Sequence, residues 1–277
     1  MTKKIFRLLF FFFVILFLVI RYFHAEYEIA RPQTNINECD EYEEADTVRN
    51  LRTQYRSWLE YASNENYCTE YQFSSSLADD SFTFRESLQV NDQFSEVDFW
   101  REVYSSLYQR DQDKMIYLQD SLLQIQKKYQ LDKDEFARMV VSFVQDIPYN
   151  YIDQGDCRTY TDQPCTAFAR FGILSPVEFL FTLKGDCDTR TVLLYTLLRN
   201  FGYDPLIINS REYQHSMLAL DIPASGESFA YKGRTYSYWE TTNVGWQPGM
   251  LPPEMSNKNY WFVALDYEYK TDLPGNY

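Results

Sequence analysis

Histidine is scarce in this chain of 277 residues, which contains only His24 and His215. A metal centre needs several imidazole, thiolate or carboxylate ligands at characteristic spacings, and the sequence shows no such cluster. It also lacks a glycine-rich phosphate-binding loop and a Gly-x-Ser-x-Gly motif. We therefore expect no metal and no cofactor, and we exclude the nucleotide-binding and serine-hydrolase classes.

Basic residues are also fewer than acidic ones: the chain contains 26 lysines and arginines and 40 aspartates and glutamates. The formal net charge is −14, and residues 1–25 hold four basic residues and no acid, which leaves −18 for the rest of the chain. A body this acidic disfavours nucleic acid and anionic lipid surfaces as partners. We therefore expect no nucleic-acid partner.

Residues 1–25 are expected to be a signal anchor or a signal peptide. Three basic residues precede an apolar run at 8–20, which is typical of an export leader. Phe23 stands where cleavage after Ala25 would require a small residue, and residues 5–23 are long enough to span a bilayer. This favours an uncleaved anchor over a cleaved peptide. Because basic residues stay inside, we expect a membrane-anchored or secreted protein whose main part is extracytoplasmic.

The five cysteines suggest two local disulfides and one free thiol. Cys157 and Cys165 bracket a short polar loop, and Cys39 and Cys68 bracket a helical-looking segment. Pairing within each set leaves Cys187 free. Outside the cytoplasm an unpaired thiol indicates a reactive role or intermolecular pairing.

Two regions follow the leader. Residues 26–97 are polar and rich in tyrosine, and we expect an accessory helical lobe there, with a helix near 45–61. Residues 98–277 are expected to form the main domain. Apolar residues at helical spacing predict helices near 98–109, 115–129, 136–144 and 176–182.

The pattern changes from helical to extended after Gly202. Short β-rich runs occur at 206–208, 215–220 and 236–240, and they are close enough in sequence to pair antiparallel. The sequence therefore predicts an α+β fold with an antiparallel sheet.

Cys187 is expected at the first turn of a buried helix that stops at Gly202. Unpaired N–H groups and the positive dipole end of a helix favour a thiolate and can bind an oxyanion. Asp186 and Asp188 oppose thiolate formation unless the first caps the helix and the second turns to solvent. The alternative is that Cys187 is a core residue or half of a disulfide.

His215 is the only histidine outside the leader region, and it stands at the start of a predicted strand. A nucleophilic thiol needs a neighbouring base, and only this imidazole is available. Glu240 ends a later aromatic strand, where a carboxylate could hold one ring nitrogen of the histidine. Its alternative is an ordinary solvated glutamate, although the aromatic residues before it favour burial.

Gly-Asp-Cys187-Asp, a leucine-rich helix ending at Gly202, His215 at a strand start and Glu240 after aromatic residues together resemble the core of transglutaminase-like proteins. That superfamily is grouped with the papain-like cysteine enzymes, and the resemblance covers residues 136–262. It implies a nucleophile helix packed on an antiparallel sheet. It also implies that Cys187 is the nucleophile, His215 the base and Glu240 the orienting acid, at a position where the family usually has aspartate.

The resemblance further implies acyl chemistry on an amide of a protein or peptide substrate. Because exported bacterial members of this superfamily are more often hydrolases than crosslinking enzymes, the resemblance favours a peptidase or amidase. The backbone N–H of Cys187 would bind the oxyanion, and Gln145 is the candidate for the second donor. A catalytically silent binding or scaffold protein of the cell envelope, attached to the membrane by the N-terminal helix, is the alternative.

Overall fold

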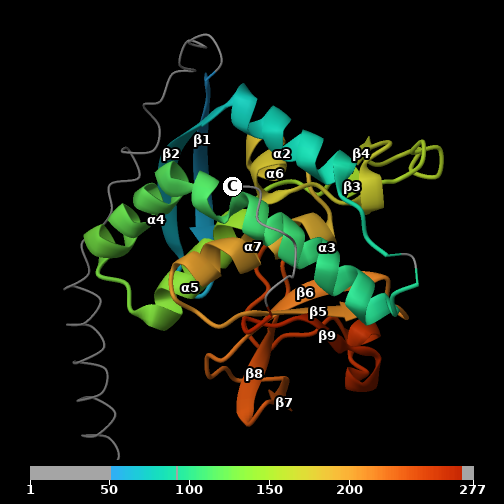
Figure 1. Cartoon of the computed structure of the whole chain (residues 1–277). Helices are drawn as coiled ribbons and strands as arrows, with labels where there is room; N and C mark the ends of the chain where they lie inside the picture. The colour runs from blue at the N-terminus through green and yellow to red at the C-terminus, as the bar shows by residue number, and fades with distance from the viewer. Residues whose placement is uncertain (1–50, 92, 270–277) are drawn as a thin grey trace, which may run out of the picture. The chain divides into compact units, whose positions relative to one another are not determined.

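The computed structural model describes residues 51–91 and 93–269 (Figure 1). Its strands are β1 (Leu51–Glu60), β2 (Glu65–Ser74), β3 (Tyr151–Ile152), β4 (Cys165–Thr166), β5 (Leu206–Ser210), β6 (His215–Leu220), β7 (Ser228–Tyr231), β8 (Arg234–Trp239) and β9 (Phe262–Leu265). Its α-helices are α2 (Ser75–Ser87), α3 (Glu96–Asp111), α4 (Ile116–Tyr129), α5 (Lys133–Gln145), α6 (Pro176–Thr182) and α7 (Cys187–Asn200). The leader expected at 1–25 lies outside these residues. Within the described ranges, no helix has both the length and the apolar character to cross a bilayer.

The predicted α+β class is confirmed by a five-stranded sheet with the strand order β7-β8-β6-β5-β9. All of its neighbouring strands pair antiparallel. Helix α7 packs on β6 and β5, and α3 packs on β9, so both helices cover the same sheet (Figure 1). The expected arrangement of a cysteine-bearing helix on an antiparallel sheet is therefore present in this coarse sense.

Side chains of the sheet alternate between two apolar clusters. Ile207, Leu218 and Leu220 belong to the main core with α7. Their neighbours Ile208 and Met217 belong to a second cluster on the opposite face. This alternation follows from the period of two in a strand, and it buries both faces of the central strands.

The helices predicted from apolar spacing are confirmed with small shifts at their ends. Helix α6 begins with Ser175 as N-cap and Pro176 in its first turn, and Glu178 completes a capping box. Helix α5 also begins with a capping box, formed by Asp132 and Glu135. Because cap residues and Pro give local start signals, the sequence located these helices well.

The helix expected near 45–61 is wrong over the part that the structure describes. Leu51–Glu60 is β1, which pairs antiparallel with β2. The Trp58 ring meets Phe143 of α5 edge-on at 5.0 Å, and its indole N–H donates to the carbonyl of Met139. Aromatic residues favour a half-buried strand surface, and this hairpin contributes to the same core as α5 rather than to a helical lobe.

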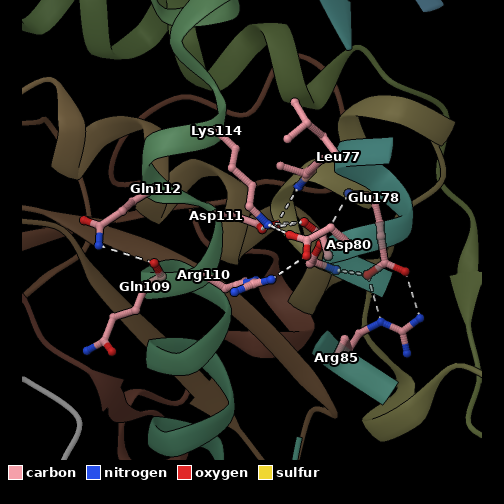
Figure 2. A network of polar contacts seen from close by, with 12 residues as sticks. Leu77, Asp80, Arg85, Gln109, Arg110, Asp111, Gln112, Lys114 and Glu178 are labelled. Carbon is pink, nitrogen blue, oxygen red and sulfur yellow. Dashed lines mark hydrogen bonds and ion pairs between the residues drawn. The ribbon is translucent and has the colours of Figure 1, made fainter. Parts of the chain in front are cut away.

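A buried polar network joins α2, α3 and α6 (Figure 2). The fully buried carboxylate of Asp111 accepts from the Ser81 hydroxyl, the Lys114 ammonium and the backbone N–H of Val177 in the first turn of α6. These bonds compensate the cost of removing its charge from water. The network fixes α6, which leads directly into the loop before Cys187.

A second charged pair closes the same junction. Arg85 of α2 donates two hydrogen bonds to Glu178 of α6, at 2.9 and 2.8 Å, and both side chains are buried. A bidentate ion pair of this kind restrains the direction as well as the distance between the two side chains. It therefore orients α6 relative to α2, and both of its contacts are drawn in Figure 2.

Candidate active site

Cys187 is the first residue of α7, as the sequence predicts, and it carries a free thiol. Asp186 is the N-cap residue, whose side chain accepts from the backbone N–H of Thr189. The cap satisfies one of the open donors of the first turn. The backbone N–H of Cys187 lies 3.3 Å from the hydroxyl oxygen of Tyr149, to which it donates.

The electrostatic environment of the thiol differs from the expectation of an easily formed thiolate. The sulfur lies 3.7 Å from Oδ2 of Asp188, and the other oxygen of that carboxylate accepts from the Tyr104 hydroxyl. Asp186 caps the helix, whereas the half-buried Asp188 stays beside the sulfur. Burial raises the pKa of the Cys187 thiol well above its usual range, and the charges of Asp188 and Asp186 raise it further. The raised pKa favours the protonated thiol over the thiolate at neutral pH.

Arg190, one turn into α7, holds the loop before the thiol. Its buried guanidinium donates to the carbonyl oxygens of Gly185, Val144 and Ile147. These three carbonyls belong to the loop before α7 and to the end of α5. One side chain thus locks the first turn of α7 against the end of the preceding helix.

His215 and Glu240 form the pair that the sequence predicts. Nε2 of His215 lies 2.9 Å from Oε2 of Glu240, and the glutamate side chain is 2% exposed. The other carboxylate oxygen accepts from the backbone N–H groups of Thr241 and Thr242 and from the Thr242 hydroxyl. Burial acts to raise the pKa of Glu240, but the hydrogen bonds and charge of His215 together with the bonds from Thr242 lower it overall. Glu240 is therefore ionised and aimed at the imidazole, which excludes the solvated alternative.

Packing of α7 on β6 brings the thiol close to the start of that strand. Thr191, one turn after Cys187, donates to the backbone carbonyl of Ser216 at 3.4 Å and lies 3.3 Å from the Thr241 hydroxyl. Hydrogen bonding to Ser216, the residue after His215, acts to lower the pKa of Cys187. The start of α7, the start of β6 and the segment after β8 therefore converge at one end of the central strands.

An open pocket of about 260 Å³ lies at this end of the sheet. Asp188 and His215 both line it, together with Trp100 of α3 and the polar side chains of Asn209 and Arg211. His215 alternates along β6 with the residues that face α7, so its ring lies on the side of Met217 and meets the Trp261 ring at 6.1 Å. At the start of the strand it lines the same pocket as Asp188, the residue after Cys187. Among the described residues the imidazole bonds Glu240 and the thiol contacts Asp188, and no hydrogen bond joins the imidazole to the thiol. The His215 side chain is 9% exposed, so the pocket gives solvent and ligands limited access to the imidazole.

Gln145 does not fit the oxyanion role expected for it. Its side-chain nitrogen donates to the backbone carbonyls of Glu240 and Trp246, at 2.7 and 3.1 Å. Both amide hydrogens are thereby engaged. Gln145 instead ties the end of α5 to the chain around Glu240, which makes it a support for the acid.

The predicted disulfide between Cys157 and Cys165 is present, with α-carbons 5.9 Å apart. The predicted pairing of Cys39 with Cys68 involves Cys39, which lies outside the described residues. Within the disulfide-bonded loop, Tyr160 stacks on Tyr151 at 4.3 Å, and Tyr151 meets Tyr149 edge-on at 5.1 Å. The loop is thus connected through aromatic contacts to the tyrosine that touches Cys187.

Three contributors to the site were missed from the sequence. Tyr149 follows Ile-Pro at the end of a helix, Tyr104 sits within an amphipathic helix, and Arg190 interrupts an apolar helix with a charge. Only Arg190 gave a usable signal, because a buried cation in a helix needs several acceptors. The described residues contain no group of three or more side chains suited to hold a metal ion.

No family model matches this chain, and comparisons with curated proteins and with solved structures find no match either.

Proposed function

We propose that the protein is a cysteine-dependent enzyme that cleaves amide bonds by acyl transfer, with Cys187 as nucleophile, His215 as base and Glu240 as orienting acid. The observation that supports it best is the buried pair of His215 and Glu240, placed beside the pocket at the N-terminus of α7. The glutamate occupies Nε2, which leaves Nδ1 of the imidazole for the thiol. A free thiol at this helix start completes the set.

In the proposed first step, Nδ1 of His215 takes the thiol proton while the sulfur of Cys187 attacks the substrate carbonyl carbon. The carbonyl π electrons move to oxygen and give a tetrahedral oxyanion. When it collapses, the carbon–nitrogen bond breaks and the amine leaves with the proton from His215. A thioester on Cys187 remains.

In the second step His215 takes a proton from water as the water oxygen attacks the thioester. The carbon–sulfur bond breaks, a carboxylic acid is released, and the proton returns to the sulfur. An amine in place of water would give a crosslinked amide. We propose hydrolysis as the main reaction, because exported members of the family that the sequence resembles are more often hydrolases than crosslinking enzymes.

The raised pKa of Cys187 decides how the thiol is activated. A preformed thiolate–imidazolium pair is disfavoured because the sulfur is buried between two acids. Proton transfer to His215 must then accompany the attack, as in general base catalysis. The reaction should therefore depend strongly on both His215 and Glu240.

The test is acylation of Cys187 by p-nitrophenyl acetate, a small activated acyl donor. We expect a burst of p-nitrophenol and an acetyl group on Cys187 in the wild-type protein, followed by slow hydrolysis. Cys187→Ala should abolish the burst, and His215→Ala should slow it by about 100-fold. An equal burst rate in wild type and His215→Ala would contradict the proposal, because a merely accessible thiol reacts without a base.

A catalytically silent scaffold is the second candidate, and the protonated, acid-flanked thiol favours it. Such a protein would use the fold for binding at the outer side of the membrane, to which residues 1–25 would attach it. Iodoacetamide separates the two candidates. An active site should alkylate Cys187 with a rate that falls in His215→Ala, whereas a scaffold should show the same slow rate in both proteins.

A further inference from the structure

The hydroxyl of Tyr149 lies beside the backbone N–H of Cys187, from which it accepts a hydrogen bond at 3.3 Å. The backbone N–H at the start of a helix is a natural donor to a developing negative charge next to the nucleophile. The phenol therefore lies next to the place where the substrate oxygen would bind.

The phenol of Tyr149 is held rigidly in this place. The Arg190 guanidinium lies over its ring at 5.4 Å, and the Tyr151 ring meets it edge-on. The next residue, Asn150, donates its backbone N–H to the carbonyl of Gly185, which fixes the segment beside the loop that leads into α7. A donor whose position is set before the reaction costs no reorganisation when charge develops.

Tyr149 also keeps its proton. Burial raises the pKa of its phenol far above the usual range, and the neighbouring Cys187 and Asp186 raise it further. The phenol oxygen accepts from the Cys187 N–H, so its own O–H remains available as a donor. A hydrogen bond from a neutral phenol to an anionic intermediate is charge-assisted, and it is stronger than a bond between two neutral groups.

We propose that Tyr149 is a catalytic residue of this site, whose O–H is the second oxyanion donor beside the backbone N–H of Cys187. This inference rests on the proposed acyl transfer and replaces Gln145, whose amide hydrogens are both engaged. As the carbonyl oxygen enters, it takes over the N–H of Cys187 from the phenol. The phenol O–H then donates to the oxyanion.

The test compares Tyr149→Phe with Tyr117→Phe in the full chain. Both variants lose one tyrosine hydroxyl, but Tyr117 is exposed on α4, whereas Tyr149 touches Cys187. We expect the burst rate with p-nitrophenyl acetate to fall by about 100-fold in Tyr149→Phe and to stay within about threefold of wild type in Tyr117→Phe. Thermal melting checks that both variants fold.

Alkylation by iodoacetamide separates oxyanion binding from mere positioning of the thiol. The attack on a saturated carbon forms no oxyanion, so the Tyr149→Phe rate should stay within about threefold of wild type. Equal losses of acylation and alkylation would overturn the inference in favour of a structural role, and so would an unchanged acylation rate. A wild-type protein without acylation that depends on Cys187 and His215 would overturn the proposed function itself. A Tyr149→Phe variant that acylates at the wild-type rate would overturn only the role of Tyr149.

Discussion

Nε2 of His215 and Oε2 of Glu240 lie 2.9 Å apart, across residues that are 25 positions apart in the chain. The two backbone N–H groups and the hydroxyl that bind the other carboxylate oxygen hold that oxygen away from the imidazole. The imidazole tautomer with hydrogen on Nε2 is therefore favoured, and Nδ1 is left as the acceptor. In the proposed reaction this nitrogen would take the proton of the thiol.

Removing the charge of Asp188 should make Cys187 more reactive. In Asp188→Asn the amide oxygen can still accept from the Tyr104 hydroxyl, but the negative charge beside the sulfur is gone. We expect the thiol pKa to fall, which raises the thiolate fraction and speeds iodoacetamide alkylation at pH 7 by about tenfold. The pH dependence of alkylation measures this.

Glu96→Gln is the control for Asp188→Asn, because Glu96 lines the same pocket but is not among the causes of the thiol shift. It should leave the alkylation profile unchanged. An Asp188→Asn profile that coincides with wild type would show that burial alone, and not this carboxylate, keeps the sulfur protonated.

Opening the disulfide of Cys157 and Cys165 should weaken the site through its tyrosines. The bond closes the loop that stacks Tyr160 on Tyr151, next to Tyr149. Loss of one such aromatic contact costs about 1 kcal/mol, which corresponds to a roughly fivefold slower acylation. The burst rate of the double Cys→Ser variant measures it.

The matched control for the disulfide variant is Thr159→Ala, an exposed change inside the same loop. It should acylate at the wild-type rate. A double Cys→Ser variant that also acylates at that rate would show that the tyrosine contacts persist without the disulfide.

Elements with local signals could be predicted from the sequence. The start of α7 was predictable because Asp186 is a cap residue and apolar residues follow at helical spacing. The β6 strand was predictable from its short apolar run after a polar loop. His215 and Glu240 could be paired only because the chain offers a single imidazole beyond the leader region.

Features that depend on distant packing could not be predicted. Leu51–Glu60 forms a strand because Trp58 packs against α5, some 80 residues later in the chain, and no short-range pattern reports that contact. The environment of the thiol was equally hidden. Asp188 accepts from Tyr104, 84 positions earlier, and its charge beside the sulfur raises the thiol pKa, the less favourable of the two outcomes that the sequence left open.

Asp111 should be one of the most sensitive positions for stability. Asp111→Ala would leave the N–H of Val177 without its buried acceptor and would remove an acceptor from the Ser81 hydroxyl and from the Lys114 ammonium, which keeps its contact with Asp80 (Figure 2). A buried donor left without an acceptor costs about 1–3 kcal/mol. Urea unfolding measures the loss, and Asp113→Ala, an exposed change two residues on, should cost less than about 0.5 kcal/mol. Similar losses in both variants would contradict the role of the network.

Glu240 should make the protein sensitive to acid. Its pKa in the folded chain is lowered from the ordinary value of 4.5, so its ionised form stabilises the fold above that pH. This contribution is lost as the pH falls through the folded pKa. We expect the free energy of unfolding to decline more steeply below about pH 4.5 in wild type than in Glu240→Gln, which has no proton to bind there. Parallel declines would show that Glu240 is not stabilised in its charged form.

Glu240→Gln is also the sharpest test of the acid in the proposed reaction. The amide keeps the shape of the side chain but removes the charge that favours proton uptake by His215, and a rotated amide can offer N–H instead of an acceptor to Nε2. Because the resting thiol is protonated, His215 must gain a proton in the transition state, so this charge should matter. We expect the burst rate with p-nitrophenyl acetate to fall by about 100-fold, with Glu240→Asp losing less because the charge is kept. Glu212→Gln, an exposed change near His215, should have no effect. If Glu240→Gln acylates at the wild-type rate while Cys187→Ala does not react, the carboxylate holds the fold together but takes no part in the chemistry.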